Sequence, residues 1–249
     1  MSPQLVLLPS ASDVAADVGG RLVTKIVSIQ ASGGIPSVVL TGGTVGIDLL
    51  AKIRDSPSRG SVDWKRIDIF WGDERFVPDA DADRNERQAR HALLDYVPVD
   101  PDRVHPMASS DGDFGADVDS AAAAYGRLVD THGPFDVTLL GLGPDGHVAS
   151  IFPEHPGVYD DRTAIPVRNS PKPPPTRISL SLPTIRQSAE VWVVTAGSNK
   201  ADAVAMAFGG AGEIAIPAVG ATGRVRTLWF LDREAAVRLP SSVFRAPIA

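Results

Sequence analysis

The chain has 249 residues, no cysteine, and 24 lysines and arginines against 30 aspartates and glutamates, a net charge of −6. The length suits one α/β domain, and the lack of cysteine excludes a disulfide scaffold, a thiolate metal site and a cysteine nucleophile. The acidic balance argues against a nucleic-acid or anionic-membrane partner, although a few well-placed cations suffice to bind a small anionic molecule.

Short apolar runs alternate with longer amphipathic segments, which predicts strands alternating with helices. In chain order, strands are expected at 5–8, 37–40, 67–71, 136–140, 177–182, 190–195 and 227–231. Helices are expected at 13–31, 45–54, 85–94, 118–132, 200–208 and 233–237, the first of them capped by Ser10 or Ser12.

This order predicts a mostly parallel, twisted sheet with helices on both faces, of the doubly wound, Rossmann-like kind, in a single domain over residues 1–249. Most strands are apolar throughout, as in sheets that are buried on both faces, whereas 177–182 alternates and predicts a half-buried strand. There is no basic targeting segment and no stretch near the ~18 apolar residues of a membrane span. We therefore expect a cytoplasmic protein.

Ligands of open parallel sheets bind beyond the carboxyl ends of the strands, and two of the expected strands end in segments that suit an anion. Thr41-Gly42-Gly43-Thr44 leads from a strand into a helix, where backbone N–H groups and the helix N-terminus favour phosphate. It lacks the Walker A spacing, and an ordinary strand-to-helix turn is the alternative. Gly197-Ser198-Asn199-Lys200 offers a lysine as a phosphate partner, and a surface lysine is the alternative.

Two further segments carry carboxylates. In Asp73-Glu74-Arg75, the arginine can grip a phosphate or carboxylate in a bidentate manner, and either acid can act in proton transfer or hold the arginine; a solvated turn is the alternative. In Gly143-Pro144-Asp145-Gly146-His147, the histidine can serve as a general base whose tautomer the aspartate fixes. A structural histidine is the alternative.

The histidines show no HExxH or paired spacing, so no metal site is expected. Their positions are His91, His105, His132, His147 and His155.

Together these segments resemble the 6-phosphogluconolactonase family. The stretches WGDERFVP and GLGPDGH are the specific ones, and the matching segments follow the family's order over about residues 5–235. They are Leu40–Thr44, Trp71–Pro78, Leu140–Ser150, Ser170–Ser179 and Gly197–Lys200.

The resemblance implies hydrolysis of 6-phospho-D-glucono-1,5-lactone to 6-phosphogluconate, in the oxidative branch of the pentose phosphate pathway, by a monomer without a cofactor. It implies that His147 activates water, that Asp145 orients His147 or shapes the loop, and that Arg75 and Lys200 hold the phosphate. Either cation, or a backbone N–H, could stabilise the oxyanion. Further substrate contacts are implied for the following residues: Gly42, Gly43, Thr44, Asp73, Asn85, Arg168 and Arg177.

The sequence departs from the family pattern at two places. Val45-Gly46 stands where a Ser/Thr-Pro pair is usual, and Arg84-Asn85 stands where Ser-Asn is common, so that Arg84 either adds a cation to the pocket or points to solvent.

Two other functions remain open. The related glucosamine-6-phosphate deaminases carry a glutamate shortly after the histidine loop, where this chain has Ser150-Ile151-Phe152-Pro153, and they usually have tyrosine at the position of Arg75. Both differences favour the lactonase. A non-catalytic sugar-phosphate sensor would carry a DNA-binding domain before the first strand, and we expect that strand to begin near Leu5, which leaves no room for one.

Overall fold

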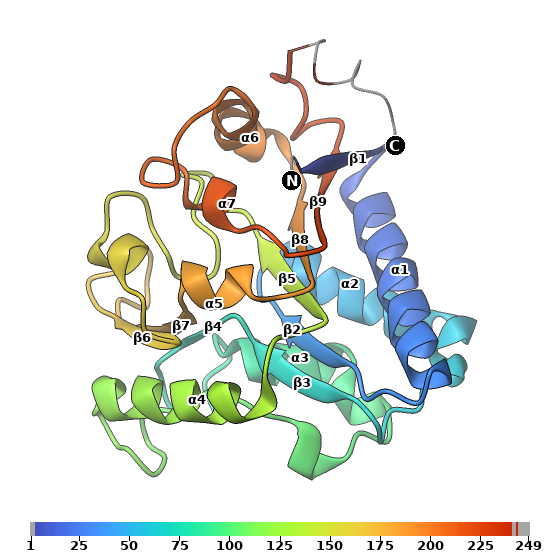
Figure 1. Ribbon diagram of the computed structural model, residues 1–249, viewed down its shortest axis with the longest axis vertical. Helices are drawn as coiled ribbons and strands as arrows, with labels where there is room; N and C mark the ends of the chain where they lie inside the picture. The colour runs from blue at the N-terminus through green and yellow to red at the C-terminus, as the bar shows by residue number, and fades with distance from the viewer. Residues whose placement is uncertain (1–2, 241–242, 244–249) are drawn as a thin grey trace.

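The central sheet of the computed structural model is parallel throughout (Figure 1). The structure describes residues 3–240 and 243. Within that part of the chain, the strands of this sheet lie in the order β1-β9-β8-β5-β2-β3. Their bounds are Gln4–Leu8 (β1), Ser37–Leu40 (β2), Asp68–Trp71 (β3), Val137–Gly141 (β5), Glu190–Thr195 (β8) and Arg226–Asp232 (β9).

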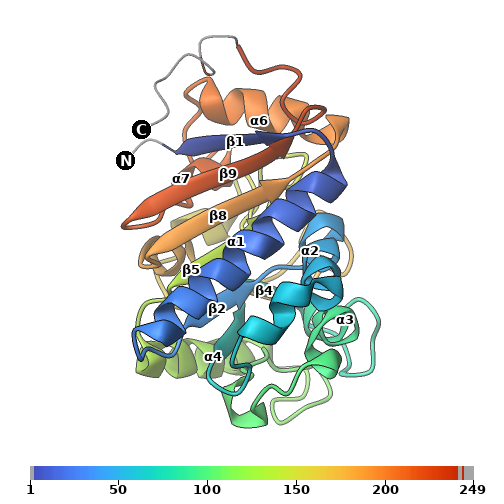
Figure 2. The same ribbon diagram turned by 90° about the vertical axis from the view of Figure 1, so that its right-hand side faces the viewer.

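Helices cover both faces of the sheet, as the sequence predicts, and Figure 2 shows α1 crossing one of them. Their bounds are Ala11–Ala31 (α1), Thr44–Asp55 (α2), Asn85–Ala92 (α3), Val118–His132 (α4), Leu182–Arg186 (α5), Ala201–Phe208 (α6) and Pro217–Gly220 (α7). Short 3₁₀ turns lie at Pro57–Ser61 (η1), Leu94–Tyr96 (η2), Pro101–Arg103 (η3), Pro156–Tyr159 (η4) and Ser198–Lys200 (η5).

Successive strand residues point to opposite faces, and this divides the core in two. On β2, Val38 and Leu40 join the cluster formed with α1, α2 and α3, whereas Val39 joins the cluster formed with α4, α5 and α6. Both faces of the sheet are therefore buried beneath helices, which explains why its strands are apolar throughout.

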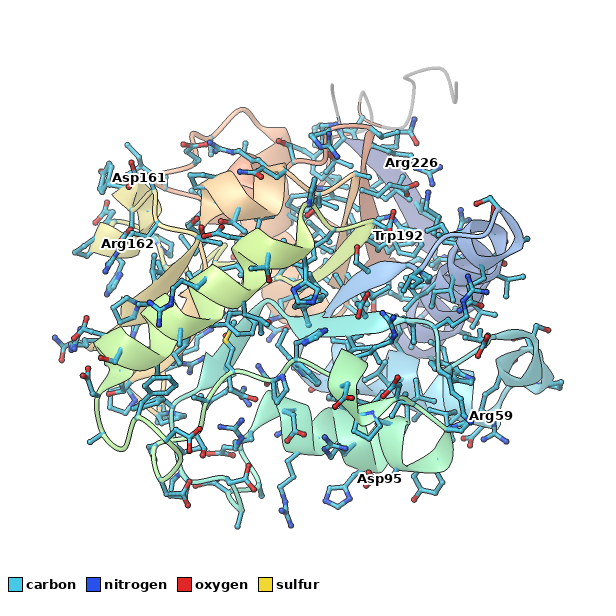
Figure 3. The ribbon with its side chains drawn as sticks, turned by 60° about the horizontal axis from the view of Figure 1, so that its bottom comes forward. Arg59, Asp95, Asp161, Arg162, Trp192 and Arg226 are labelled. Carbon is cyan, nitrogen blue, oxygen red and sulfur yellow. The ribbon has the colours of Figure 1, made fainter. Side chains whose placement is uncertain are left out.

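A buried carboxylate lies at the amino end of the sheet. Glu190, the first residue of β8, accepts hydrogen bonds from Trp192 Nε1 (2.9 Å), Arg226 Nη2 (2.7 Å) and Lys25 Nζ (2.9 Å). Figure 3 labels Trp192 and Arg226 on this side of the molecule. These bonds compensate the burial of the charge and join β8, β9 and α1.

A second, antiparallel sheet has the order β4-β7-β6. Its strands are Asp73–Arg75 (β4), Ala164–Val167 (β6) and Arg177–Leu180 (β7), and the amide of Leu180 donates to the carbonyl of Gly72 (2.8 Å). The prediction that 177–182 is half-buried is wrong, because β7 is the central strand and all its residues are buried. The strand also stops earlier than expected, since Ser181 caps α5.

The helix expected at 233–237 is also absent from this part of the described chain, where residues 233–238 form turns. The carboxylate of Asp232 accepts hydrogen bonds from the amides of Ala235 (2.8 Å) and Gly197 (3.0 Å). Such side-chain-to-backbone bonds compete with a helix ladder. Elsewhere, Ser10 caps α1 as expected.

The order of the strands locates a binding crevice. From β2 the chain continues to the adjacent strand β3, toward one edge of the sheet. From β5 it continues to the adjacent strand β8, toward the opposite edge. The direction of strand addition therefore reverses between β2 and β5. Ligands bind at such a switch, beyond the carboxyl ends of the strands. Among the helices of the described residues, none is long and apolar enough to cross a membrane.

Candidate active site

A cavity of about 250 Å³ opens at the carboxyl ends of β2 and β5, where the strand order switches. Residues from both sheets and from the proline-rich loop contribute to its wall. They are Thr41, Gly42, Gly43, Asp73, Arg75, Asn85, Gly141, Leu142, Gly143, His147, Ala149, Lys172, Pro173, Arg177 and Lys200.

The loop after β5 carries an aspartate–histidine dyad. Nδ1 of His147 lies 2.5 Å from Oδ1 of Asp145, so Nε2 is the nitrogen left to exchange a proton with a ligand. The imidazole packs on Phe152, with 4.5 Å between the ring centroids. The dyad therefore has one orientation, set by a carboxylate on one side and an aromatic ring on the other.

The backbone beneath the dyad requires glycine. A Cβ on Gly143 would lie 2.0 Å from Nδ1 of His147 and 2.4 Å from Oδ1 of Asp145, and Gly146 has a φ of 88°. The amide of Gly143 donates to the carbonyl of His147 (2.8 Å), which closes the loop. The glycines in this segment thus let both side chains fold back over the chain.

Asp145 is held as a carboxylate. Partial burial acts to raise its pKa, but the hydrogen bond to His147 and the charges of His147 and Lys172 outweigh burial and bring the pKa well below its usual range. Nζ of Lys172 lies 3.7 Å from Oδ1 of Asp145. An ionised Asp145 favours the tautomer of His147 with the proton on Nδ1.

Asp73 and Asn85 form a buried polar pair in the cavity wall. Nδ2 of Asn85 donates to the carbonyl of Asp73 (2.8 Å), and Oδ2 of Asp73 accepts from Ser150 Oγ (2.6 Å). Among the described residues, Oδ1 of Asn85 has no partner, and it lies 1.9 Å from the position of a Cβ on Gly42. Glycine at 42 therefore makes room for this buried acceptor.

Glu74 does not line the cavity and instead anchors α3. Its carboxylate accepts from the amides of Arg75 (2.9 Å), Asn85 (2.7 Å) and Glu86 (2.9 Å). Burial raises its pKa to about 7, although Arg84 and these amides act to lower it. Nη2 of Arg84 lies 3.9 Å from this carboxylate and is buried, so Arg84 neither adds a cation to the cavity nor points to solvent.

Cations meet in the cavity from three directions. Arg75 comes from β4, and its buried Nε has no partner among the described residues. Lys200 comes from η5, and its pKa is lowered by burial and by the charge of Lys172.

Arg177 on β7 donates to the carbonyls of Lys172 (3.1 Å), Pro173 (3.1 Å) and Pro174 (3.2 Å). Burial lowers the pKa of Arg177, and its guanidinium lies 3.9 Å from Asp73. Arg177 thus fixes the proline-rich loop that brings Lys172 to the site.

The sequence prediction missed Lys172, although the quoted segment SPKPPPT contains it. The prediction for Arg168 differs from the structure: this side chain is exposed, pairs with Asp119 at the start of α4 and does not line the cavity. Thr44 lines an adjoining cavity of about 500 Å³, which shares Gly42, Gly43 and Lys200 with the first. This second cavity lies at the N-terminus of α2, where Gly43 has a φ of 82° and no side chain caps the helix.

Comparison with known proteins agrees with this geometry. Residues 9–229 match the family model described as glucosamine-6-phosphate isomerases/6-phosphogluconolactonase. A 6-phosphogluconolactonase of Streptomyces coelicolor is 56% identical over 98% of this chain and 97% of its own length, and one of Mycobacterium tuberculosis is 48% identical over 97% and 100%. The solved structure of 6-phosphogluconolactonase from Trypanosoma brucei superposes with a TM-score of 0.82 at 28% identity, covering 96% of this chain and 99% of that one.

Proposed function

The chain belongs to the glucosamine-6-phosphate isomerase/6-phosphogluconolactonase family, and on that basis we infer both its reaction and how its residues divide the work. The protein hydrolyses 6-phosphogluconolactone to 6-phosphogluconate in the pentose phosphate pathway. The roles assigned below to individual side chains are our proposal.

The observation that carries the proposal is the dyad of His147 and Asp145, whose histidine lines a cavity rich in cations. Nε2 of His147 accepts a proton from a water molecule, whose oxygen attacks the lactone carbonyl carbon. The carbon–oxygen bond of the ring then breaks, and the ring oxygen leaves as a hydroxyl after taking up the proton from His147. Asp145 stabilises the imidazolium between these two steps. A positioned base of this kind contributes about 10²–10⁴-fold to the rate.

The phosphate is held by Arg75 and Lys200, beside the N-terminus of α2. Both side chains reach the cavity, and Arg75 has a buried donor that is unpaired within the described residues. The amides that open a helix attract an anion, and Gly43 and Thr44 present them here, directly after Gly42. Holding the phosphate at a distance from the dyad orients the ring for attack.

Asn85 contacts a sugar hydroxyl in this proposal, and Asp73 positions it. The free Oδ1 of Asn85 accepts a hydroxyl hydrogen, and Asp73 keeps the amide of Asn85 turned so that this oxygen is available. Nε and Nη2 of Arg177 donate to the loop carbonyls, and Nη1 lies 3.5 Å from Oγ of Ser150. In this proposal Arg177 therefore acts by positioning the loop that carries Lys172.

The glucosamine-6-phosphate deaminase alternative finds no support at this cavity. No glutamate occurs among the described residues that line it, and the segment after the histidine loop supplies Ala149 instead. We also propose that the chain acts as a single domain and a monomer, because the cavity draws its wall from residues 41–200 of one chain.

The test is hydrolysis of freshly generated 6-phosphogluconolactone by the purified protein in the presence of EDTA, followed by coupled detection of 6-phosphogluconate. We expect a rate far above spontaneous hydrolysis, and no release of ammonia from glucosamine 6-phosphate. If the folded protein hydrolysed the lactone no faster than the spontaneous reaction, the proposal would be contradicted.

A further inference from the structure

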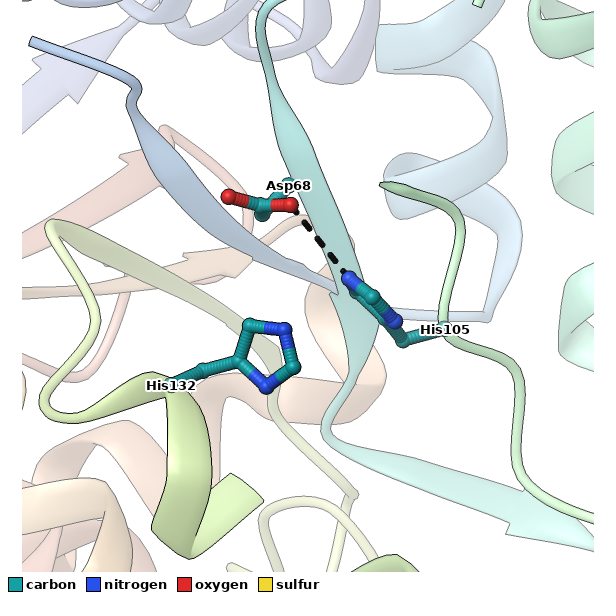
Figure 4. A group of neighbouring side chains, drawn as sticks. All are labelled: Asp68, His105 and His132. Atoms are coloured by element: carbon teal, nitrogen blue, oxygen red, sulfur yellow. Dashed lines mark hydrogen bonds and ion pairs between the residues drawn. The ribbon is translucent and has the colours of Figure 1, made fainter. Parts of the chain in front are cut away.

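A second group of polar side chains meets at the opposite end of the sheet, at the start of β3. Asp68 is the first residue of that strand, and His132 is the last residue of α4. His105 lies beside the strand because its amide donates to the carbonyl of Ile69 (2.8 Å). Figure 4 shows the three side chains converging from these separate segments.

The donor atoms lie at distances that a metal ion can close. Nε2 of His105 is 3.3 Å from Oδ1 of Asp68, and one ligand atom from each residue lies within 4.8 Å of the others. Tetrahedral bonds of about 2.0–2.1 Å, as in zinc sites, place ligand atoms about 3.3 Å apart. The contact between Asp68 and His105 already has this spacing, and His132 needs to approach by at most about 1.5 Å, within the reach of an exposed side chain at a helix end.

Both imidazoles are oriented by neighbours. Nδ1 of His132 lies 2.8 Å from the carbonyl of Leu128, which places the proton on Nδ1 and leaves the lone pair on Nε2, the ring atom that faces Asp68 and His105 in Figure 4. A backbone carbonyl on the second ring nitrogen is the usual support of a metal-binding histidine. The ring of His105 stacks on Phe70, with 4.5 Å between centroids.

Arg103 also contacts this group, with Nη1 at 3.0 Å from each carboxylate oxygen of Asp68. An ionised carboxylate has about four lone-pair positions, so one oxygen can bind a metal while the other keeps its hydrogen bond. Metal-bound carboxylates are commonly hydrogen-bonded in this way. Arg103 therefore orients the carboxylate of Asp68.

We propose that Asp68, His105 and His132 bind one divalent transition-metal ion, for which Zn²⁺ is the best fit. Two imidazoles and one carboxylate form a ligand set typical of zinc, and a water molecule completes the tetrahedron on the exposed side of His132. The ion ties the end of α4 to the edge of β3. The catalytic dyad follows the carboxyl ends of the strands, whereas this site lies at the amino end of β3, so the metal has a structural role and takes no part in the hydrolysis.

The test is calorimetric titration of the EDTA-treated and dialysed full chain with ZnCl₂. We expect about one equivalent to bind, and Co²⁺ to give the visible absorption of a tetrahedral complex. His132→Gln removes one ligand at an exposed position and should weaken binding by at least about 10-fold, the lower limit found for loss of an outer-shell partner. His105→Ala should do the same.

Two matched controls separate this site from other histidines. His91→Gln alters an exposed histidine on α3, and His147→Ala removes the imidazole of the dyad; both should keep the one equivalent of Zn²⁺. Zn²⁺ should also raise the Tm of the unaltered protein and of His91→Gln, but not that of His132→Gln.

Absence of saturable Zn²⁺ binding would overturn the proposal, as would binding that is unchanged in His132→Gln. Loss of the bound equivalent in His147→Ala would assign the metal to the dyad and also overturn it. None of these outcomes depends on lactone hydrolysis, which is measured in EDTA.

Discussion

The large parallel sheet and the small antiparallel sheet contribute to the active site in different ways. The parallel sheet contributes through the loops that follow its strands, which present Gly42, Gly43, Asp145, His147 and Lys200. The small sheet contributes from within its strands, in residues that are tied into buried bonds. The difference suggests that the loops perform the chemistry, whereas the small sheet mainly positions neighbouring groups and adds one cation, Arg75, to the anion site.

The small sheet shows this division in its charges. Asp73 bonds Ser150, and Arg177 bonds three carbonyls of the proline-rich loop. Arg75 alone on this sheet has a buried donor without a partner in the described part of the chain. Charged side chains whose hydrogen bonds are already made stay in one orientation, and they hold the groups bonded to them in fixed positions.

The largest effect is expected from Gly143→Ala, which tests whether the loop after β5 holds the catalytic dyad in place. The new Cβ would lie 2.0 Å from Nδ1 of His147, so the dyad must move while the strand below it stays in place. We expect kcat to fall about 10²–10⁴-fold, the contribution of a positioned base. Steady-state kinetics measure kcat. As a control, the Tm of the variant should lie within a few degrees of that of the unaltered protein. Normal turnover would mean that the dyad is not held by its fit over Gly143.

Next in size is the pH dependence of stability set by Glu74 of the small sheet. Its pKa is about 7 in the folded protein against an ordinary value of 4.5, so the folded protein binds more protons than the unfolded chain between these values. The free energy of unfolding should therefore fall as pH rises from 4.5 to 7, by about 3 kcal/mol from this group.

Glu74→Gln removes that titration and should flatten this part of the curve. Urea unfolding of both proteins at pH 4.5, 6 and 7.5 measures the difference. Parallel curves for the two proteins would show that Glu74 does not titrate in this range.

A smaller effect is expected from Arg177→Lys. Lysine keeps the positive charge beside Asp73 but cannot bond the carbonyls of Lys172, Pro173 and Pro174 together. Loss of one such bond is worth about 0.5–1.5 kcal/mol, which is up to about tenfold in KM, with a smaller change in kcat. A tenfold fall in kcat at constant KM would give Arg177 a role in the chemical step instead of loop positioning.

The smallest effect is expected from Arg168→Gln. The exposed pair of Arg168 with Asp119 lies outside the cavity, and exposed pairs contribute about 0–1 kcal/mol to stability. We expect kcat and KM within about twofold of those of the unaltered protein, on the scale of the ±0.5 kcal/mol typical of surface substitutions. A clear rise in KM would return Arg168 to the substrate contacts that the family resemblance implies.

The same comparison explains what could be predicted from the sequence. Strands of the parallel sheet are apolar runs between helices, and their positions were predicted to within a residue or two; β2 and β8 match at both ends. The strands β4 and β6 were missed, because Asp73–Arg75 consists of charged residues and Ala164–Val167 contains Pro166. Both pair with the buried β7, and that tertiary pairing leaves no periodic pattern in the sequence.

The site divides along similar lines. Residues in the glycine-rich loops could be identified because the loops follow strand ends, and the structure places His147, Arg75 and Lys200 in one cavity. The side chain of Arg168 could not be placed, since its direction depends on Asp119, 49 residues away. The group formed by Asp68, His105 and His132 could not be predicted either, because only the fold brings these distant positions together.

The central claim, that His147 activates water in this cavity, is tested most directly by kcat for lactone hydrolysis in His147→Ala, compared with His155→Gln as the matched histidine control. Nε2 of His155 bonds the carbonyl of Arg168 and the side chain does not line the cavity, so its variant should retain nearly full activity. The account predicts a fall of about 10²–10⁴-fold in kcat for His147→Ala, with its circular dichroism spectrum unchanged. Turnover in His147→Ala equal to that of His155→Gln would contradict it.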